Sequence, residues 1–216
     1  MSDRLKLADV IAADLPDWRM INNALYTAYE TGGFAYGLEL LEQIGEAAEA
    51  ADHHPDVILT YPRLEVKLSS HDVGGVTDRD LTLARIISDL ALTAGHVADT
   101  GHTVVEYGLD THDGSRLARF WAAVLDADLE DEDGEESVAT GPYAPGVWFQ
   151  QSAPLPEPPA QRWHPDVWVP HDGAEERIKA ALDAGGKLVD DTHAPSFWVL
   201  ADPDGNKVCI CTDLER

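Results

Sequence analysis

Residues 51–55, Ala51-Asp52-His53-His54-Pro55, mark the point where a helical pattern ends and an extended pattern begins. From residue 34 to residue 51, apolar side chains recur at intervals of three and four with no proline, which predicts an amphipathic helix. Residues 57–59 and 64–70 then predict two strands joined by a turn at 61–62. The two histidines therefore stand at the exit of a helix, directly before a sheet.

A third histidine follows the second of these predicted strands. Residues 64–70 alternate apolar and polar side chains, so Ser70 shares the apolar face and His71 is expected to close the polar face. Further along, Thr77 and Asp80 have the Ser/Thr-x-x-acid spacing of a helix start, with an apolar helical stripe behind them. We expect the three histidines and the carboxylate, carried by three elements, to converge on one pocket.

The surrounding residues complete a small domain. Apolar positions in 5–15 predict a short helix, and polar–apolar alternation in 18–29 predicts one or two strands. The predicted order is helix, two strands, helix, two strands, helix. Glycines within 95–101 indicate a boundary, which gives a first domain over 1–98 and a second over 102–216.

The second half contains an internal repeat with an offset of 59 residues. The tripeptide His-Asp-Gly at 112–114 opens an amphipathic stretch, and it recurs at 171–173 before another. Gly146 and Gly205 each precede an apolar run at the same offset. Each unit is therefore predicted to contain a strand, a helix and further strands. The acidic run 126–136 inside the first unit predicts a solvated loop.

The composition is that of a globular protein with a strongly acidic surface. Hydrophobic residues make up 44% of the chain, but 40 Asp and Glu residues oppose 15 Lys and Arg, for a formal net charge of −25. Such a field repels nucleic acids and anionic lipids, because phosphate binding depends on clustered basic side chains. We therefore expect no nucleic-acid partner and no membrane partner.

Two further patterns predict a cytoplasmic protein. Apolar runs stay far below the roughly 20 residues of a membrane span, and the first residues lack the basic-then-apolar layout of a secretory signal. Cys209 and Cys211 lie two apart on a predicted strand, where a bridge between them would be strained, so we expect reduced thiols.

The histidine group suits proton transfer. Neutral imidazole can accept or donate a proton near pH 7, so three such groups can serve an elimination that removes one proton and supplies another. Other interpretations remain open for single residues: His53 or His54 can bind the last carbonyls of the helix, and Asp80 can act only as a helix cap. Zinc binding is a third interpretation, although adjacent histidines chelate one ion poorly and no thiol lies nearby in the sequence.

The spacing of these residues resembles the signature of a known family. From Trp18 to about Leu92 the chain is similar to the pterin-4a-carbinolamine dehydratases, through Glu49, His53-His54-Pro55, Tyr61, His71 and Asp80. The resemblance implies an α+β domain of αββαββα order with an antiparallel sheet, which self-associates into a homo-oligomer. It implies removal of water from a small-molecule pterin substrate, a 4a-hydroxytetrahydropterin, to give the quinonoid dihydropterin for pterin recycling, without metal or organic cofactor.

The same resemblance implies roles for individual residues. Four positions would carry the chemistry: His53 and His71 as the acid and base pair, His54 holding the pterin, and Asp80 orienting a histidine. Four more would contact the substrate: Glu49, Pro55, Tyr61 and Ser70.

Residues 103–212 resemble the glyoxalase-like branch of the vicinal oxygen chelate superfamily, in which two βαβββ modules form a cupped sheet. The segment 197–206 is similar to that superfamily's closing segment. Many members bind a divalent metal through the first and last strands of each module, and the corresponding residues are Glu106, Gln150, His164 and Cys209. Gln150 and Cys209 make an oxygen-rich site doubtful. A metal-dependent enzyme and a small-molecule binding module, with the first domain as dimerisation partner, therefore remain alternatives.

Overall fold

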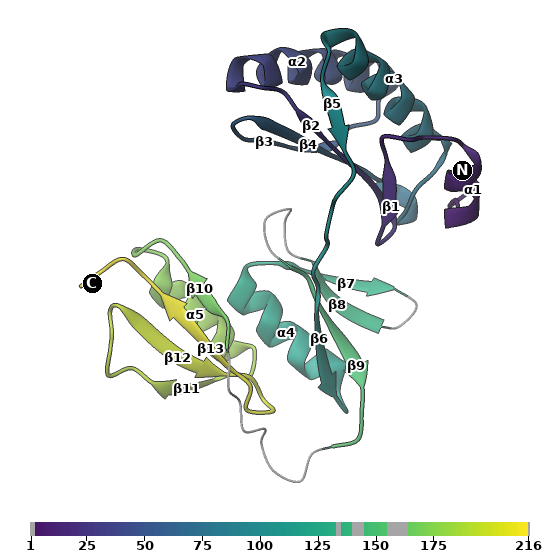
Figure 1. Cartoon of the computed structure of the whole chain (residues 1–216). Coiled ribbons are helices and arrows are strands. Elements are labelled where there is room, and N and C mark those ends of the chain that lie inside the picture. Colours follow the sequence, from purple (N-terminus) through teal and green to yellow (C-terminus); the bar gives the residue numbers. More distant parts are fainter. Residues whose placement is uncertain (1–2, 133–134, 140–144, 155–163, 216) are drawn as a thin grey trace. The chain divides into compact units, whose positions relative to one another are not determined.

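A computed structural model describes residues 3–132, 135–139, 145–154 and 164–215 (Figure 1). The chain divides into two compact units, Met1–Val104 and Val105–Arg216. The domain ranges expected from sequence, 1–98 and 102–216, stay predictions; in the structure, residues 97–99 pair with the sheet of the first unit.

The first unit is an α+β domain, as predicted. Its helices and strands follow the predicted order, with one short strand added at the end that sequence patterns did not indicate. In chain order the elements are α1 (Leu7–Ala12), β1 (Arg19–Ile21), β2 (Ala24–Glu30), α2 (Phe34–Ala51), β3 (Asp56–Leu59), β4 (Arg63–Leu68), the 3-10 helix η1 (His71–Val73), α3 (Asp78–Ala94) and β5 (Val97–Asp99).

The sheet of the first unit is antiparallel throughout its described pairs. Its strand order is β1-β2-β4-β3, and β5 pairs with β2. Helices α2 and α3 cover one face (Figure 1). Strand β4 alternates as predicted, because Leu64, Val66 and Leu68 are buried in the core beneath these helices. Leu25 and Tyr29 of β2 lie opposite Leu68 and Leu64 and extend this apolar layer.

Helix α2 ends in a backbone turn that places His53. Asp52 adopts the left-handed conformation (φ 47°, ψ 42°), and its N–H donates to the carbonyls of Ala48 and Glu49. The N–H of His53 then donates to the Ala48 carbonyl at 3.1 Å. This pattern is a Schellman-type ending, which satisfies the last carbonyls while it reverses the chain direction. The His53 side chain is thereby directed beneath the start of α3.

One detail of the prediction for β4 was wrong. Strand β4 ends at Leu68, and His71 does not close its polar face but begins η1. Ser70 keeps the inward direction expected for it and is buried. The chain turns here because Ser70 and Gly75 pair through both backbone hydrogen bonds of an isolated bridge, which closes a tight loop around η1.

The second unit consists of two βαβββ modules, as the repeat predicted. The first contains β6 (Tyr107–Thr111), α4 (Gly114–Leu125), β7 (Asp128–Glu132), β8 (Glu135–Ala139) and β9 (Val147–Gln151); the second contains β10 (Asp166–Trp168), α5 (Ala174–Asp183), β11 (Lys187–Asp190), β12 (Phe197–Ala201) and β13 (Lys207–Cys211). The two sheets have equivalent orders, β6-β9-β8-β7 and β10-β13-β12-β11. The prediction of a loop for the acidic run 126–136 was wrong, since β7 and the start of β8 lie within this run.

The two modules share one core and one buried carboxylate. Helices α4 and α5 pack together, and apolar side chains of both modules form a single cluster. Asp202, in the β12–β13 turn, is fully buried and accepts hydrogen bonds from Trp121 Nε1 of α4 at 3.2 Å and from Asn206 Nδ2 at 2.8 Å. Burial raises the pKa of Asp202, although these donors oppose the rise. The closing turn of the second module is thus tied to the first module.

The segment after β5 packs a histidine onto the helix-free face of the first sheet. The rings of His102 and Tyr26 lie 5.7 Å apart between centroids, and both His102 ring nitrogens are buried without a hydrogen-bond partner among the described residues. Burial lowers the pKa of His102 below its ordinary 6.5, and Arg63 lowers it further, whereas the charges of Glu65 and Asp99 raise it.

This histidine predicts a pH dependence of stability. Because the folded state disfavours the protonated ring, the unfolded chain binds the proton more tightly, and the contribution of His102 is lost as pH falls through and below 6.5. We expect urea unfolding of the first unit to weaken more between about pH 7.5 and 5.5 in the wild type than in His102→Phe, which keeps a ring against Tyr26 but does not titrate. Identical pH profiles would contradict this expectation.

Candidate active site

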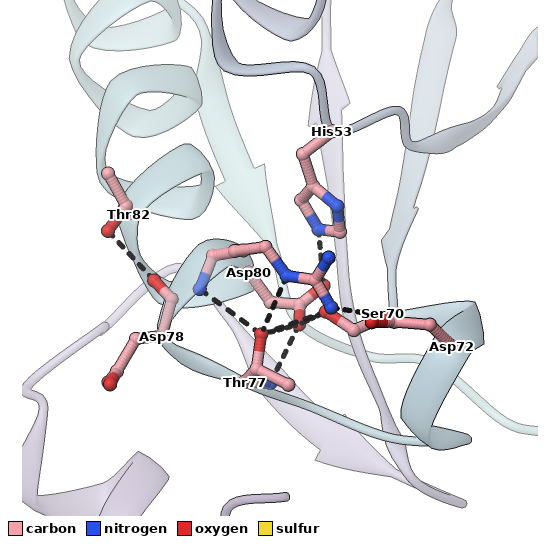
Figure 2. Close-up of polar contacts among 8 residues, drawn as sticks. His53, Ser70, Asp72, Thr77, Asp78, Asp80 and Thr82 are labelled. Carbon is pink, nitrogen blue, oxygen red and sulfur yellow. Dashed lines mark hydrogen bonds and ion pairs between the residues drawn. The ribbon is translucent and has the colours of Figure 1, made fainter. Parts of the chain in front are cut away.

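The carboxylate of Asp80 is the centre of the histidine cluster. Asp80 is 0% exposed and His53 is 7% exposed, and His53 Nε2 lies 2.7 Å from Asp80 Oδ1. The two residues come from the start of α3 and from the end of α2. Figure 2 shows the imidazole directed at the carboxylate, with Ser70 and Thr77 around its other oxygen.

The second carboxylate oxygen, Oδ2, binds the loop and the helix start. It accepts hydrogen bonds from Ser70 Oγ and from the Thr77 backbone N–H, each at 2.7 Å. The Thr77 hydroxyl lies 3.2 Å from the same oxygen and 2.8 Å from Ser70 Oγ. The capping box predicted for Thr77 and Asp80 is therefore present. Asp80 caps α3 through one oxygen and binds His53 through the other, so the two interpretations of this residue are compatible.

This arrangement fixes the state of the His53 ring. An ionised carboxylate can only accept hydrogen bonds, so Nε2 must carry the proton in the contact with Oδ1. In the neutral ring the lone pair is then on Nδ1, on the side of the imidazole away from Asp80. His53 is consequently held in one orientation, with Nε2 toward Asp80 and Nδ1 on the other side of the ring.

The other predicted residues of the first unit are distributed around this buried pair. His54 is exposed, and its Nε2 lies 3.3 Å from Glu49 Oε1, one helical turn back on α2. Pro55 leads into β3 beside His53. Tyr61 is 75% exposed in the β3–β4 turn, beyond the far end of β3 from His53. The structure therefore brings Glu49 to His54 but does not bring Tyr61 to the cluster.

His71 is exposed on η1, the turn that leads from Ser70. The next residue, Asp72, forms an ion pair with Arg79 of α3. The hydrogen bond that Arg79 donates to Asp72 is the main reason that the pKa of Asp72 is lowered, and the charge of His53 lowers this pKa further. The η1 turn is thus fastened to α3. The sequence spacing did not single out Arg79, although its position one residue before Asp80 placed it at this helix start.

In the second unit only part of the predicted metal set comes together. The donor atoms of His164, Asp166 and Cys209 all lie within 4.8 Å of one another. Among the described residues, these three side chains form a group that is close enough together to hold a metal ion. Glu106 is exposed and outside this group, and Gln150 is exposed on the other sheet. Sequence reasoning missed Asp166, although its spacing of two from His164 puts both on one strand face.

Comparisons with known proteins identify the first unit. Residues 3–90 match the family model described as pterin 4 alpha carbinolamine dehydratase. A protein of Thermosynechococcus vestitus, assigned by its name to these dehydratases, is 37% identical over 94 residues, which is 43% of this chain and 99% of the relative. The first domain belongs to the pterin-4a-carbinolamine dehydratase family. A similarly named protein of Halobacterium salinarum is 37% identical over 90 residues, 41% of this chain and 98% of the relative.

The second unit is a glyoxalase-like domain, since residues 106–211 match the family model with that description. Among solved structures, a glyoxalase/bleomycin resistance protein/dioxygenase family enzyme from Burkholderia phytofirmans is 18% identical, with a TM-score of 0.42, over 52% of this chain and all of that chain (100%). A transcriptional coactivator/pterin dehydratase from Brucella melitensis is 28% identical, with a TM-score of 0.40, over 41% of this chain and 99% of that chain. Among the residues that the structure describes, the helices are too short or too polar to cross a bilayer.

The dehydratase domain depends on Asp80 for stability as well as for the position of His53. In Asp80→Ala, the Thr77 N–H, the Ser70 hydroxyl and the His53 ring lose a buried acceptor, so we expect the free energy of unfolding to fall by roughly 3–5 kcal/mol. Urea unfolding measures this change. Asp78→Ala is the matched control, because Asp78 is exposed in the same helical turn and its loss should cost only about 0.3–1 kcal/mol. Equal unfolding midpoints for the two variants would contradict the expectation.

Proposed function

We propose that the first domain dehydrates a 4a-hydroxytetrahydropterin to the quinonoid dihydropterin, in support of pterin recycling. The observation that carries this proposal is the buried His53–Asp80 pair at 2.7 Å in a domain of the dehydratase family. A buried carboxylate that holds an imidazole in one orientation is an arrangement suited to acid–base chemistry. The small-molecule substrate follows from the family.

The proposed reaction requires two proton transfers and no electron transfer. The bond between ring carbon C4a and its hydroxyl oxygen breaks, and the oxygen leaves as water after it receives a proton. The electron pair of nitrogen N5 forms the new double bond to C4a, and N5 then loses its proton. Substrate and products are at the same oxidation level, so the chemistry needs no redox cofactor, and we propose that it proceeds without metal or organic cofactor.

We assign His53 and His71 as the acid and base pair. His53 presents Nδ1 while Asp80 holds Nε2, and His71 lies on the η1 turn that follows Ser70, which donates to the same carboxylate. Which of the two protonates the hydroxyl and which removes the N5 proton is left open. His54, exposed beside Glu49, is proposed to hold the pterin, with Glu49 and Pro55 also contacting it.

Two of the predicted substrate contacts need a different interpretation in this proposal. Ser70 is buried and bonded to Asp80, which favours a positioning role over direct contact with the pterin. Tyr61 lies at the other end of β3, where it would reach a pterin only if the substrate site extended along that strand. Self-association of the chain into a homo-oligomer and a cytoplasmic location remain part of the proposal.

A direct assay tests the proposed activity and the role of His71. The measurement is the rate of 4a-hydroxytetrahydropterin dehydration by the full chain, followed by the absorbance of the quinonoid product. In His71→Ala we expect turnover to fall by about a hundred- to ten-thousand-fold, because general acid–base groups typically contribute that much. His96→Ala, at the far end of α3, is the control and should keep the wild-type rate. Normal turnover by His71→Ala would contradict the role of His71, and no dehydration by the wild type would contradict the function.

A second prediction separates the positioning of His53 from the stability of the fold. Ser70→Ala removes one donor to Asp80 Oδ2 but leaves the Oδ1 contact with His53 in place. We expect turnover to fall by roughly tenfold with KM little changed, because a looser carboxylate holds the ring less well. Ser70→Thr, which keeps the hydroxyl, should restore much of the loss. A rise in KM with unchanged kcat would instead support direct contact of Ser70 with the substrate.

A further inference from the structure

Among the described residues of the glyoxalase-like domain, the oxygen-rich metal site that the fold family implies does not come together. That site would draw ligands from both modules, at Glu106 and Gln150 as well as at His164 and Cys209. In the part of the chain that the structure describes, the ligand-type side chains that lie together are those of His164 and Cys209 from the second module, with Asp166 as the third member. The donor set is therefore one imidazole, one carboxylate and one thiol.

We propose that His164, Asp166 and Cys209 form a binding site for a thiophilic divalent cation of the Zn²⁺ class. A thiolate with an imidazole favours Zn²⁺ and similar borderline ions, whereas Mg²⁺, Ca²⁺ and Mn²⁺ prefer sets of oxygen ligands. The site lies within one module and is separate from the dehydratase pocket in the chain. It keeps His164 and Cys209 of the two-module set described above, but it contains Asp166 in place of Glu106 and Gln150 and so prefers a different metal.

The backbone register explains why these side chains meet. Strands β10 and β13 are parallel neighbours, and Asp166 lies directly beside Cys209 in their register. The Cys209 N–H donates to the Pro165 carbonyl at 3.0 Å, which holds the segment before β10 against β13. His164 precedes Asp166 by two positions, and its Nε2 lies 3.4 Å from Asp166 Oδ1. The strand pairing thus places Asp166 beside Cys209, and His164 lies close to both because it precedes Asp166 by two positions.

The spacing is close to that of a tetrahedral ion. Zn²⁺ bonds of about 2.0–2.3 Å place neighbouring ligand atoms roughly 3.3–3.8 Å apart. The three donors here lie within 4.8 Å of one another, so side-chain rotations of His164 and Asp166 can bring them into range. Both side chains are about half exposed, at 48% and 53%, which leaves them free to make that adjustment.

The three side chains differ in burial. Cys209 is buried, at 5% exposed, while His164 and Asp166 lie at the solvent-exposed side of the group. Three protein ligands with an accessible side leave a fourth position for water, which is the pattern of open zinc sites. The net charge of −25 also raises the local concentration of cations. Trp168 lies on the same strand face, two positions beyond Asp166.

Cobalt substitution tests the proposal on the full-length chain. Co²⁺ bound to a thiolate gives a charge-transfer absorption in the near ultraviolet, which histidine and carboxylate ligands alone do not give. We expect this band to appear with one equivalent of Co²⁺, to be removed by one equivalent of Zn²⁺ and to be unaffected by excess Mg²⁺. The histidine cluster of the first domain contains no thiol and cannot produce it.

Variants identify the ligands. Cys209→Ser should abolish the band, and His164→Ala and Asp166→Asn should each weaken Co²⁺ affinity by at least about tenfold. Cys211→Ser is the matched control, because Cys211 lies on the same strand and face but outside the group. Asp166→Asn alters an exposed side chain, so it keeps the test valid if the buried Cys209 variant folds poorly, which circular dichroism reports.

Three results would overturn the site. The first is no thiolate band with wild-type protein at micromolar Co²⁺. The second is a band that persists in Cys209→Ser or disappears equally in Cys211→Ser. The third is displacement of Co²⁺ by Mg²⁺ as readily as by Zn²⁺, which would indicate an oxygen-ligand site elsewhere.

Discussion

The fold of the first domain and the position of His53 both depend on one fully buried carboxylate, Asp80. Taking an ionised group out of water is costly unless every lone pair finds a donor. Asp80 meets this condition with the Thr77 amide, two hydroxyls and an imidazole. These donors come from three segments, so the helix start, the loop after β4 and the exit of α2 are held in one arrangement. The oxygen that caps α3 and the oxygen that orients His53 belong to the same group, so a substitution of Asp80 affects both the stability of the fold and the position of the histidine.

The second domain uses a buried carboxylate in a similar way. Asp202 holds the β12–β13 turn through Asn206 and reaches Trp121 of the other module. Its donors are neutral amides and an indole, so the carboxylate gains less from them than Asp80 gains from a ring that can carry charge. Asp202 therefore links the duplicated modules structurally, while the proposed metal ligands belong to the second module, with Cys209 buried on β13 and His164 and Asp166 exposed at the start of β10.

Sequence patterns predicted the parts of this molecule that are encoded locally. Apolar periodicity located α2 and α3, Thr77-x-x-Asp80 located a helix start, and the repeat located both modules. Strand β5 was missed because three residues carry no periodicity and pair only through β2. The acidic strands β7 and β8 were missed because their many charged residues were interpreted as a solvated loop and not as an extended segment. The contact of Asp80 with His53 and the place of Asp166 beside Cys209 depend on tertiary register, which spacing along the chain does not contain.

Strand β5 decides where a fused domain is attached. It returns the chain from α3 to the sheet and pairs with β2, on the side of that strand away from β4 and β3. At about 4.8 Å per strand, the outgoing linker leaves roughly 14 Å across the sheet from β3, the strand that His53 enters. The first domain thus places the exit of its C-terminal linker and the strand that follows His53 at opposite edges of one sheet.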